Sequence, residues 1–212
     1  MAIRMTRASR TRTLIETGLA EPTIGILGAG RMGMALASRW VASGHRVFLG
    51  SRSLPRALEL SATLGPNALG ASYRQAAASG HVIVLTIPPH AVLEVVGDLA
   101  ELFDDKIVLD CSASASAVTW EDRHLQASLA EQVAHCAPGA RVIKALATMP
   151  SSTIAGGHRP KPRTLYCGDD VFAKSTVRRL LEELELDPVD GGALSEARHF
   201  EYFASRSVWN VS

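Results

Sequence analysis

Short apolar runs alternate along the chain with stretches whose apolar positions recur at helical spacing. The first run covers residues 23–27, and the apolar positions after Gly33 recur at the spacing of a helix until Gly44. A second strand is predicted from residue 46, so a strand, a helix and a further strand are complete by residue 50. This order predicts a βαβ unit with two parallel strands.

The same alternation continues through the next hundred residues. Helices are predicted at 55–64, 72–79 and 89–102, and strands at 68–71, 82–87, 107–111 and 141–146. The run at 82–87 begins with four apolar residues and has no polar face, which is typical of a strand covered by helices on both sides. We therefore predict an α/β fold of the Rossmann type, with a doubly wound and mostly parallel sheet.

The pattern changes after residue 150. Residues 150–162 are rich in Gly, Pro and Ser and predict a loop; a strand at 164–167, a helix at 171–185, a strand at 187–189 and a closing helix at 195–209 follow it. We expect three parts: a basic, flexible N-terminal arm at 1–21, a Rossmann domain at 22–150, and a small α/β C-terminal lobe at 151–212. A transit segment, or a start codon upstream of the true one, are alternative interpretations of the Arg-rich arm.

Charge and composition exclude several classes of partner. The net charge is +1, so we expect neither nucleic acid nor a membrane surface as a partner. No apolar stretch approaches the ~20 residues that span a bilayer. The three cysteines lie far apart, which argues against a disulfide framework or a structural zinc site. We expect no metal and a reducing, cytoplasmic setting.

A glycine-rich turn follows the first predicted strand. Its residues are Gly28, Ala29, Gly30, Arg31, Met32 and Gly33. In this context the first glycine permits a tight turn, the second lets the backbone approach a pyrophosphate, and the third lets the helix pack close to the strand. Amide groups at the start of the helix then hold the phosphates. The turn predicts a bound dinucleotide.

The end of the second predicted strand indicates which dinucleotide binds. NAD-binding proteins place an Asp or Glu there to accept from the ribose 2′-hydroxyl, whereas this chain has Ser51 and Arg52, with Arg56 one helical turn further on. Hydroxyl and guanidinium groups bind a 2′-phosphate that a carboxylate would repel. We therefore predict NADP(H) as the cofactor.

Acid and base machinery is sparse. No Tyr is followed by a Lys four residues later, and neither a G-x-S-x-G elbow nor an H-E-x-x-H motif occurs. His90 lies just past the end of a predicted strand and is a weak catalytic candidate, with helix capping as the alternative. Hydride exchange between two bound rings needs alignment more than proton donors, so this sparseness favours such an exchange.

Six segments in this order resemble the deazaflavin-dependent NADP oxidoreductases. They are residues 28–33, 50–52, 84–88, 142–146, 167–170 and 192–195, and the resemblance covers about residues 22–210. In that family hydride passes between NADP(H) and the 8-hydroxy-5-deazaflavin coenzyme F-420. The resemblance implies that residues 22–150 bind NADP and that residues 151–212 complete a second-substrate pocket and join a homodimer.

The resemblance also assigns residues to each ligand. Ser51, Arg52 and Arg56 would hold the 2′-phosphate; Thr86, Ile87 and Pro88 would flank the nicotinamide; Ala147, Thr148, Met149 and Pro150 would line the second pocket. Some relatives carry His or Asn where this chain has Ala147, and residues 112–137, with Trp120 and His124, have no close counterpart.

Two other functions stay open on the sequence. One is an NADPH-dependent reductase of a flavin, an imine or another small conjugated acceptor, in which His90, Lys144 or Asp110 assists protonation. The other is a protein that binds or senses NADPH without turnover. A small-molecule redox co-substrate is the expected partner for the deazaflavin exchange and for the reductase.

Overall fold

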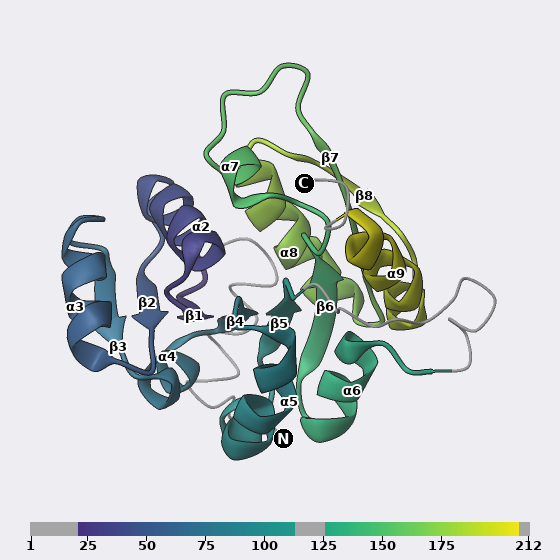
Figure 1. Ribbon diagram of the computed structural model, residues 1–212, viewed down its shortest axis with the longest axis horizontal. Coiled ribbons are helices and arrows are strands. Elements are labelled where there is room, and N and C mark those ends of the chain that lie inside the picture. The colour runs from purple at the N-terminus through teal and green to yellow at the C-terminus, as the bar shows by residue number, and fades with distance from the viewer. Residues whose placement is uncertain (1–20, 113–125, 208–212) are drawn as a thin grey trace, which may run out of the picture.

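The computed structural model describes residues 21–112 and 126–207. Their strands form a single eight-stranded sheet in the order β3-β2-β1-β4-β5-β6-β7-β8 (Figure 1). The strands are β1 Ile24–Leu27, β2 Val47–Gly50, β3 Ala68–Ala71, β4 Val82–Leu85, β5 Ile107–Asp110, β6 Arg141–Ala145, β7 Arg163–Gly168 and β8 Asp187–Asp190. Neighbouring strands are parallel, except that β7 runs antiparallel to β6. The predicted α/β class and Rossmann-type sheet are confirmed.

Helices cover both faces of the sheet. They are α2 Arg31–Ala42, α3 Leu54–Ala62, α4 Tyr73–Ser79, α5 Pro89–Leu99, α6 Leu129–Cys136, α7 Ser151–Ile154, α8 Val171–Glu183 and α9 Ala197–Ser207, with 3₁₀ turns at Ala100–Leu102 and Leu194–Glu196. Residues of α2 and α8 pack into one hydrophobic cluster, and residues of α4, α5, α6 and α9 into the other. The fully buried strands β1, β4 and β5 lie between these layers, which is why their sequences have no polar face.

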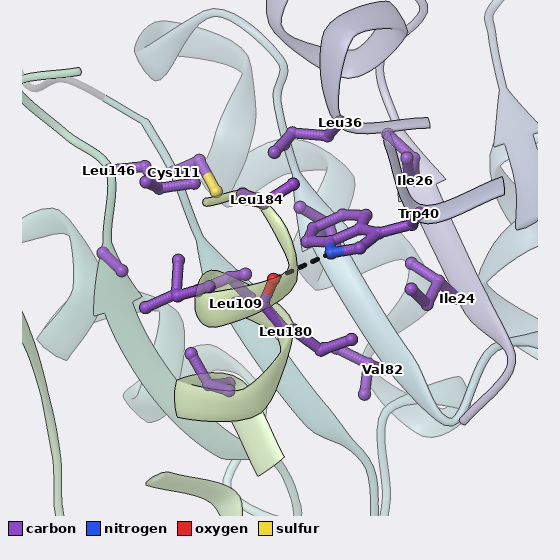
Figure 2. Packing of buried hydrophobic residues seen from close by; sticks show 14 of the residues in the cluster. Ile24, Ile26, Leu36, Trp40, Val82, Leu109, Cys111, Leu146, Leu180 and Leu184 are labelled. Atoms are coloured by element: carbon purple, nitrogen blue, oxygen red, sulfur yellow. Dashed lines mark hydrogen bonds between the residues drawn. The ribbon is translucent and has the colours of Figure 1, made fainter. Parts of the chain in front are cut away.

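Trp40 joins α2 to α8 across the first of these clusters. Its ring is fully buried, and its Nε1 donates a hydrogen bond of 3.0 Å to the carbonyl oxygen of Leu180 (Figure 2). Figure 2 shows the ring between the side chains of β1 and those of α8. A buried indole N–H needs such a partner, so this contact fixes how α8 lies against α2.

The structure refines several predicted boundaries. The predicted loop at 150–162 contains the short helix α7, and the predicted closing helix begins with a 3₁₀ turn. Helix α6 was not predicted at all, although Ser128 and Glu131 form a capping box at its start. The segment expected as a C-terminal lobe supplies β7 and β8, which continue the main sheet beyond β6.

Some expectations concern residues that the structure does not describe. The N-terminal arm, apart from Glu21, and the segment with Trp120 and His124 lie outside the described residues. Within the described part of the chain, every helix is too short or too polar to cross a membrane.

Candidate functional site

A cavity of about 520 Å³ opens at the carboxyl ends of the parallel strands. Four chain segments line it: the glycine turn after β1 (28–30), the turn after β2 with the start of α3 (51–53 and Arg56), Tyr73 at the start of α4, and the turn after β4 (86–88). In an open α/β sheet, ligands bind at this edge where the strand order reverses. Here the chain passes from β1 to β2 on one side and the sheet continues with β4 on the other.

The glycines of the turn have different reasons to be glycine. Gly28 has a φ of +125°, a conformation that favours glycine. A Cβ on Gly33 would lie 1.9 Å from the carbonyl oxygen of Gly28, so α2 packs directly against the turn. A Cβ on Gly30 would meet no atom within 4 Å. Gly30 therefore borders open space beside the cavity, where a ligand can approach the backbone.

The wall formed after β2 is basic. Arg52 and Arg56 are exposed and line the cavity, and no Asp or Glu lines it with them. Ser51 accepts a hydrogen bond of 3.2 Å from the backbone N–H of Ser53, and Ser53 caps the start of α3 by accepting from the N–H of Arg56. The hydroxyl hydrogen of Ser51 stays available to a ligand. The wall thus suits an anionic group such as a 2′-phosphate.

Thr86 and Tyr73 complete the cavity from the other strands. The Thr86 hydroxyl donates to the carbonyl oxygen of Gly28 at 2.9 Å, which ties the end of β4 to the glycine turn. Tyr73 was not predicted as a site residue, although it follows the strand ending at residue 71, and the ends of parallel strands meet at one edge. Burial raises the pKa of the Tyr73 hydroxyl above its usual value, while the positive charge of Arg52 acts in the opposite direction.

A second cavity of about 670 Å³ lies next to the glycine turn, between the starts of α2 and α7. It is lined by Arg31, Met34, Pro150, Ser151 and Ser152. Of the four residues predicted for the second pocket, Pro150 lies here, while Met149 packs partly buried against the core. Arg31, which the sequence assigns to the dinucleotide, lines this cavity. The two serines were not predicted.

The candidate proton donors lie elsewhere. His90 is exposed near the start of α5 and lines neither cavity. Lys144 and Asp110 are fully buried and form an ion pair of 2.8 Å. They therefore have no access to a substrate in either cavity, so the structure does not support them as proton donors.

Lys144 is instead the centre of a buried ionic network. Its Nζ also lies 2.9 Å from a carboxylate oxygen of Glu201 and donates to the carbonyl oxygen of Ser112 at 2.7 Å. Burial lowers the pKa of Lys144, but the negative charges of Asp110 and Glu201 outweigh it and raise that pKa overall. Glu201 also accepts from the backbone N–H groups of Leu129 and Ala130. The network thus holds α9 against β5, β6 and the start of α6.

Residues 23–114 match the model of one protein family, described as NADP oxidoreductase, coenzyme F420-dependent. The match includes the glycine turn, the basic wall, Tyr73 and the turn after β4. It therefore covers all four chain segments that line the first cavity, and NADP is the dinucleotide that the family description names.

Similar proteins over most of the chain are reductases. The chain is 30% identical over 202 residues to the metalloreductase STEAP3 of Rattus norvegicus, covering 94% of this chain and 40% of that protein. It is 28% identical to the F420-dependent NADP reductase of Methanothermobacter thermautotrophicus, covering 82% of each. The chain thus spans about two fifths of the length of the curated metalloreductases that it matches.

Solved structures agree with this assignment. A protein of Arthrobacter sp. FB24, whose description assigns it as an F420 dependent NADP-reductase, superposes with a TM-score of 0.75 at 26% identity, covering 89% of this chain and 91% of its own. An imine reductase of Streptomyces aurantiacus shares the fold with a TM-score of 0.67 at 23% identity. Both superpositions agree with the Rossmann-like architecture of the described residues.

Proposed function

Because residues 23–114 match the model of the coenzyme F420-dependent NADP oxidoreductases, we propose that this chain transfers a hydride between NADP(H) and a deazaflavin coenzyme. The observation that carries the proposal is the arrangement of two adjoining cavities on either side of the glycine turn. The first has the basic wall of an NADP site, and the second is large enough for part of a second ring system.

The residues of the first cavity fit NADP(H). Backbone N–H groups of the glycine turn and of the start of α2 would hold the pyrophosphate. The side chains of Ser51, Arg52 and Arg56 would hold the 2′-phosphate, and Thr86 to Pro88 would flank the nicotinamide. When bound, NADPH supplies the hydride. The protein's part is to align the two rings and to exclude water from between them.

The lining of the second cavity bears on the acceptor. Its residues are one cation, Arg31, two hydroxyls and the apolar side chains of Met34 and Pro150. This lining offers no carboxyl or imidazole group as a proton donor, which suits an acceptor that takes a hydride without a protein acid. A deazaflavin is such an acceptor, since the charge can spread over its conjugated ring.

A second candidate is the reduction of a flavin or another small conjugated acceptor. The observation in its favour is that relatives aligned over 88% to 94% of the chain are named metalloreductases, a class whose name does not include a deazaflavin. A protein that binds NADPH without turnover is the third candidate. We also propose a homodimer, because Leu165 and Val189 on the outer strands pair in register and are both exposed.

The purified chain, mixed with NADPH and the oxidised deazaflavin coenzyme, tests the proposal. We expect the deazaflavin absorbance to bleach with NADPH and much more slowly with NADH. Bleaching of riboflavin derivatives but not of the deazaflavin would favour the second candidate. Saturable NADPH binding, with no acceptor of either kind reduced, would leave the third. Light scattering of the same sample measures the molecular mass of the protein in solution, and we expect the mass of two copies of the chain.

A further inference from the structure

Three side chains that are far apart in the sequence meet near the amino-terminal edge of the sheet. Glu21 precedes β1, His45 lies between α2 and β2, and Glu183 is the last residue of α8. One possible ligand atom from each lies within 4.8 Å of the other two. Since β1 and β2 are parallel, this cluster lies at the edge opposite the glycine turn and the first cavity.

The hydrogen-bond geometry of His45 leaves one ring nitrogen aimed into this cluster. The His45 side chain is 1% exposed, and its Nδ1 lies 3.2 Å from the carbonyl oxygen of Pro22. A carbonyl oxygen only accepts, so Nδ1 carries the hydrogen. Nε2 lies 2.7 Å from a carboxylate oxygen of Glu183 and 3.7 Å from one of Glu21. When the ring is protonated, Nε2 donates this hydrogen bond to Glu183. When the ring is neutral, Nε2 offers a lone pair, and a metal ion between it and the two carboxylates takes the place of that proton.

Within residues 21–112 and 126–207, no Lys or Arg side chain forms an ion pair with the carboxylate of Glu21 or Glu183. Arg39 on α2 pairs with Glu185 at 3.5 Å and contacts Glu183 only through its carbonyl oxygen. Arg46 lies over the ring of Phe48. Glu183 also ends α8, where the helix dipole is negative and a further negative charge is unfavourable. A metal ion at this point would contact Nε2 of His45 and the carboxylates of Glu21 and Glu183.

We propose that Nε2 of His45 and the carboxylates of Glu21 and Glu183 bind a divalent transition metal, with Zn²⁺ as the ion of best fit. One imidazole nitrogen and two carboxylate oxygens are Zn²⁺ ligands, with water in the fourth position. Zinc bonds of about 2.1 Å place tetrahedral ligand atoms about 3.4 Å apart, a value that lies between the 2.7 and 3.7 Å separations seen here, so Glu183 would move back from Nε2 to admit the ion. The hydrogen bond from Nδ1 to Pro22 is the outer contact that orients a metal-bound histidine.

The site has a structural consequence. Bound metal would join the segment before β1, the turn between α2 and β2, and the end of α8. The backbone N–H of His45 donates to the carbonyl oxygen of Trp40, whose indole already joins α2 to α8. Metal binding here adds to the stability of this layer. It does not depend on the proposed hydride transfer, because the cofactor cavity lies at the other edge of the sheet.

Calorimetric titration of the chelator-treated full chain with Zn²⁺ tests the proposal. We expect one saturable site and a higher melting temperature with Zn²⁺ present. Glu21→Gln is the most useful variant, because the Glu21 side chain is 59% exposed and its loss leaves the core intact. We expect Glu21→Gln and Glu183→Gln each to weaken Zn²⁺ binding by roughly tenfold or more. Glu182→Gln is the matched control, since Glu182 pairs with Arg178 on the outer side of α8.

Cobalt supplies a second measurement. Co²⁺ bound in a tetrahedral site with nitrogen and oxygen ligands gives visible absorption bands, which we expect in the parent protein and in Glu182→Gln but not in Glu21→Gln. The absence of saturable Zn²⁺ binding would overturn the proposal, as would binding that Glu21→Gln and Glu183→Gln leave unchanged. Binding lost in Cys136→Ser instead would assign the metal to a thiol and overturn it as well. NADPH affinity, measured in parallel, reports on the cofactor cavity independently.

Discussion

The basic wall of the first cavity predicts that Arg52→Ala separates NADPH from NADH. Arg52 is exposed, lines the cavity, and has no carboxylate partner among the described residues. Its guanidinium group is therefore available for a charged hydrogen bond to the 2′-phosphate. Losing one such bond costs about 1.5–3 kcal/mol, which corresponds to a roughly 10- to 150-fold weaker binding of NADPH. NADH lacks the phosphate and should lose almost none of its affinity.

Equilibrium binding of both dinucleotides, followed by nicotinamide fluorescence or calorimetry, measures this difference. The control is Arg74→Ala, which removes another exposed arginine, one that pairs with Glu101 and lies outside the lining of the cavity. We expect Arg74→Ala to leave both affinities near the parent values. Increasing salt should weaken NADPH binding to the parent more than to Arg52→Ala, because the charge interaction is screened.

An equal loss of affinity for both dinucleotides in Arg52→Ala would refute the reasoning. Arg52 would then contact a group common to NADPH and NADH, such as the pyrophosphate. An unchanged affinity for NADPH would refute it in another way, by showing that Ser51 and Arg56 suffice. The melting temperature of the variant should match the parent in each case, since among the described residues the Arg52 guanidinium group forms no hydrogen bond or ion pair.

Three further predictions concern the glycine turn and the ionic contacts of α9. Gly30→Ala should keep the parent's melting temperature, because its Cβ meets no protein atom, but it should bind NADPH roughly tenfold more weakly. Gly33→Ala should instead lose about 1–3 kcal/mol of unfolding free energy, because its Cβ would meet the carbonyl oxygen of Gly28. Equal melting temperatures for the two variants would contradict the assigned packing. Lys144→Met should lower the free energy of unfolding in urea by about 3–5 kcal/mol, since it leaves Asp110 and Glu201 as buried unpaired charges; a loss as small as that of the exposed control Lys161→Met would argue against the network. Although partial burial raises the pKa of Glu131, hydrogen bonds from Arg198 and Ser128 lower it overall, so its contribution is present above the carboxyl's unfolded pKa and is lost as the pH falls through the folded pKa. The stability difference between the parent and Glu131→Gln should therefore shrink on acidification, and a difference that grows would show that the assigned pKa direction is wrong.

Local pattern was enough to predict the strands that lie at the centre of the sheet. The runs that become β1, β4 and β5 are apolar because both faces of each strand are covered, and that requirement is visible in the sequence itself. The glycine turn and the basic residues after β2 were also visible, because a turn and a binding wall built from adjacent residues need no distant partner. Residues of these two features form most of the lining of the first cavity.

Only the tertiary structure decided which distant residues meet. Helix α6 was missed although its capping box was present, because its eight residues carry too short a pattern to distinguish a helix. The packing of α7 against α2 makes Arg31 a lining residue of the second cavity, which its place in the glycine motif does not reveal. The roles of Lys144 and of His45 depend on carboxylates that lie 57 and 138 residues away along the chain, Glu201 and Glu183.

The difference between the features that the sequence predicted and those that only the tertiary structure decided has a physical cause. The sequence by itself determined the elements whose burial or backbone conformation is set by neighbours within a few residues: the parallel strands, the glycine turn and the basic wall. Contacts between charged groups depend instead on the way β7 joins β6 in the opposite direction and brings α8 and α9 back over the sheet. The ionic network and the cluster around His45 follow from that reversal, and no periodicity along the chain encodes it.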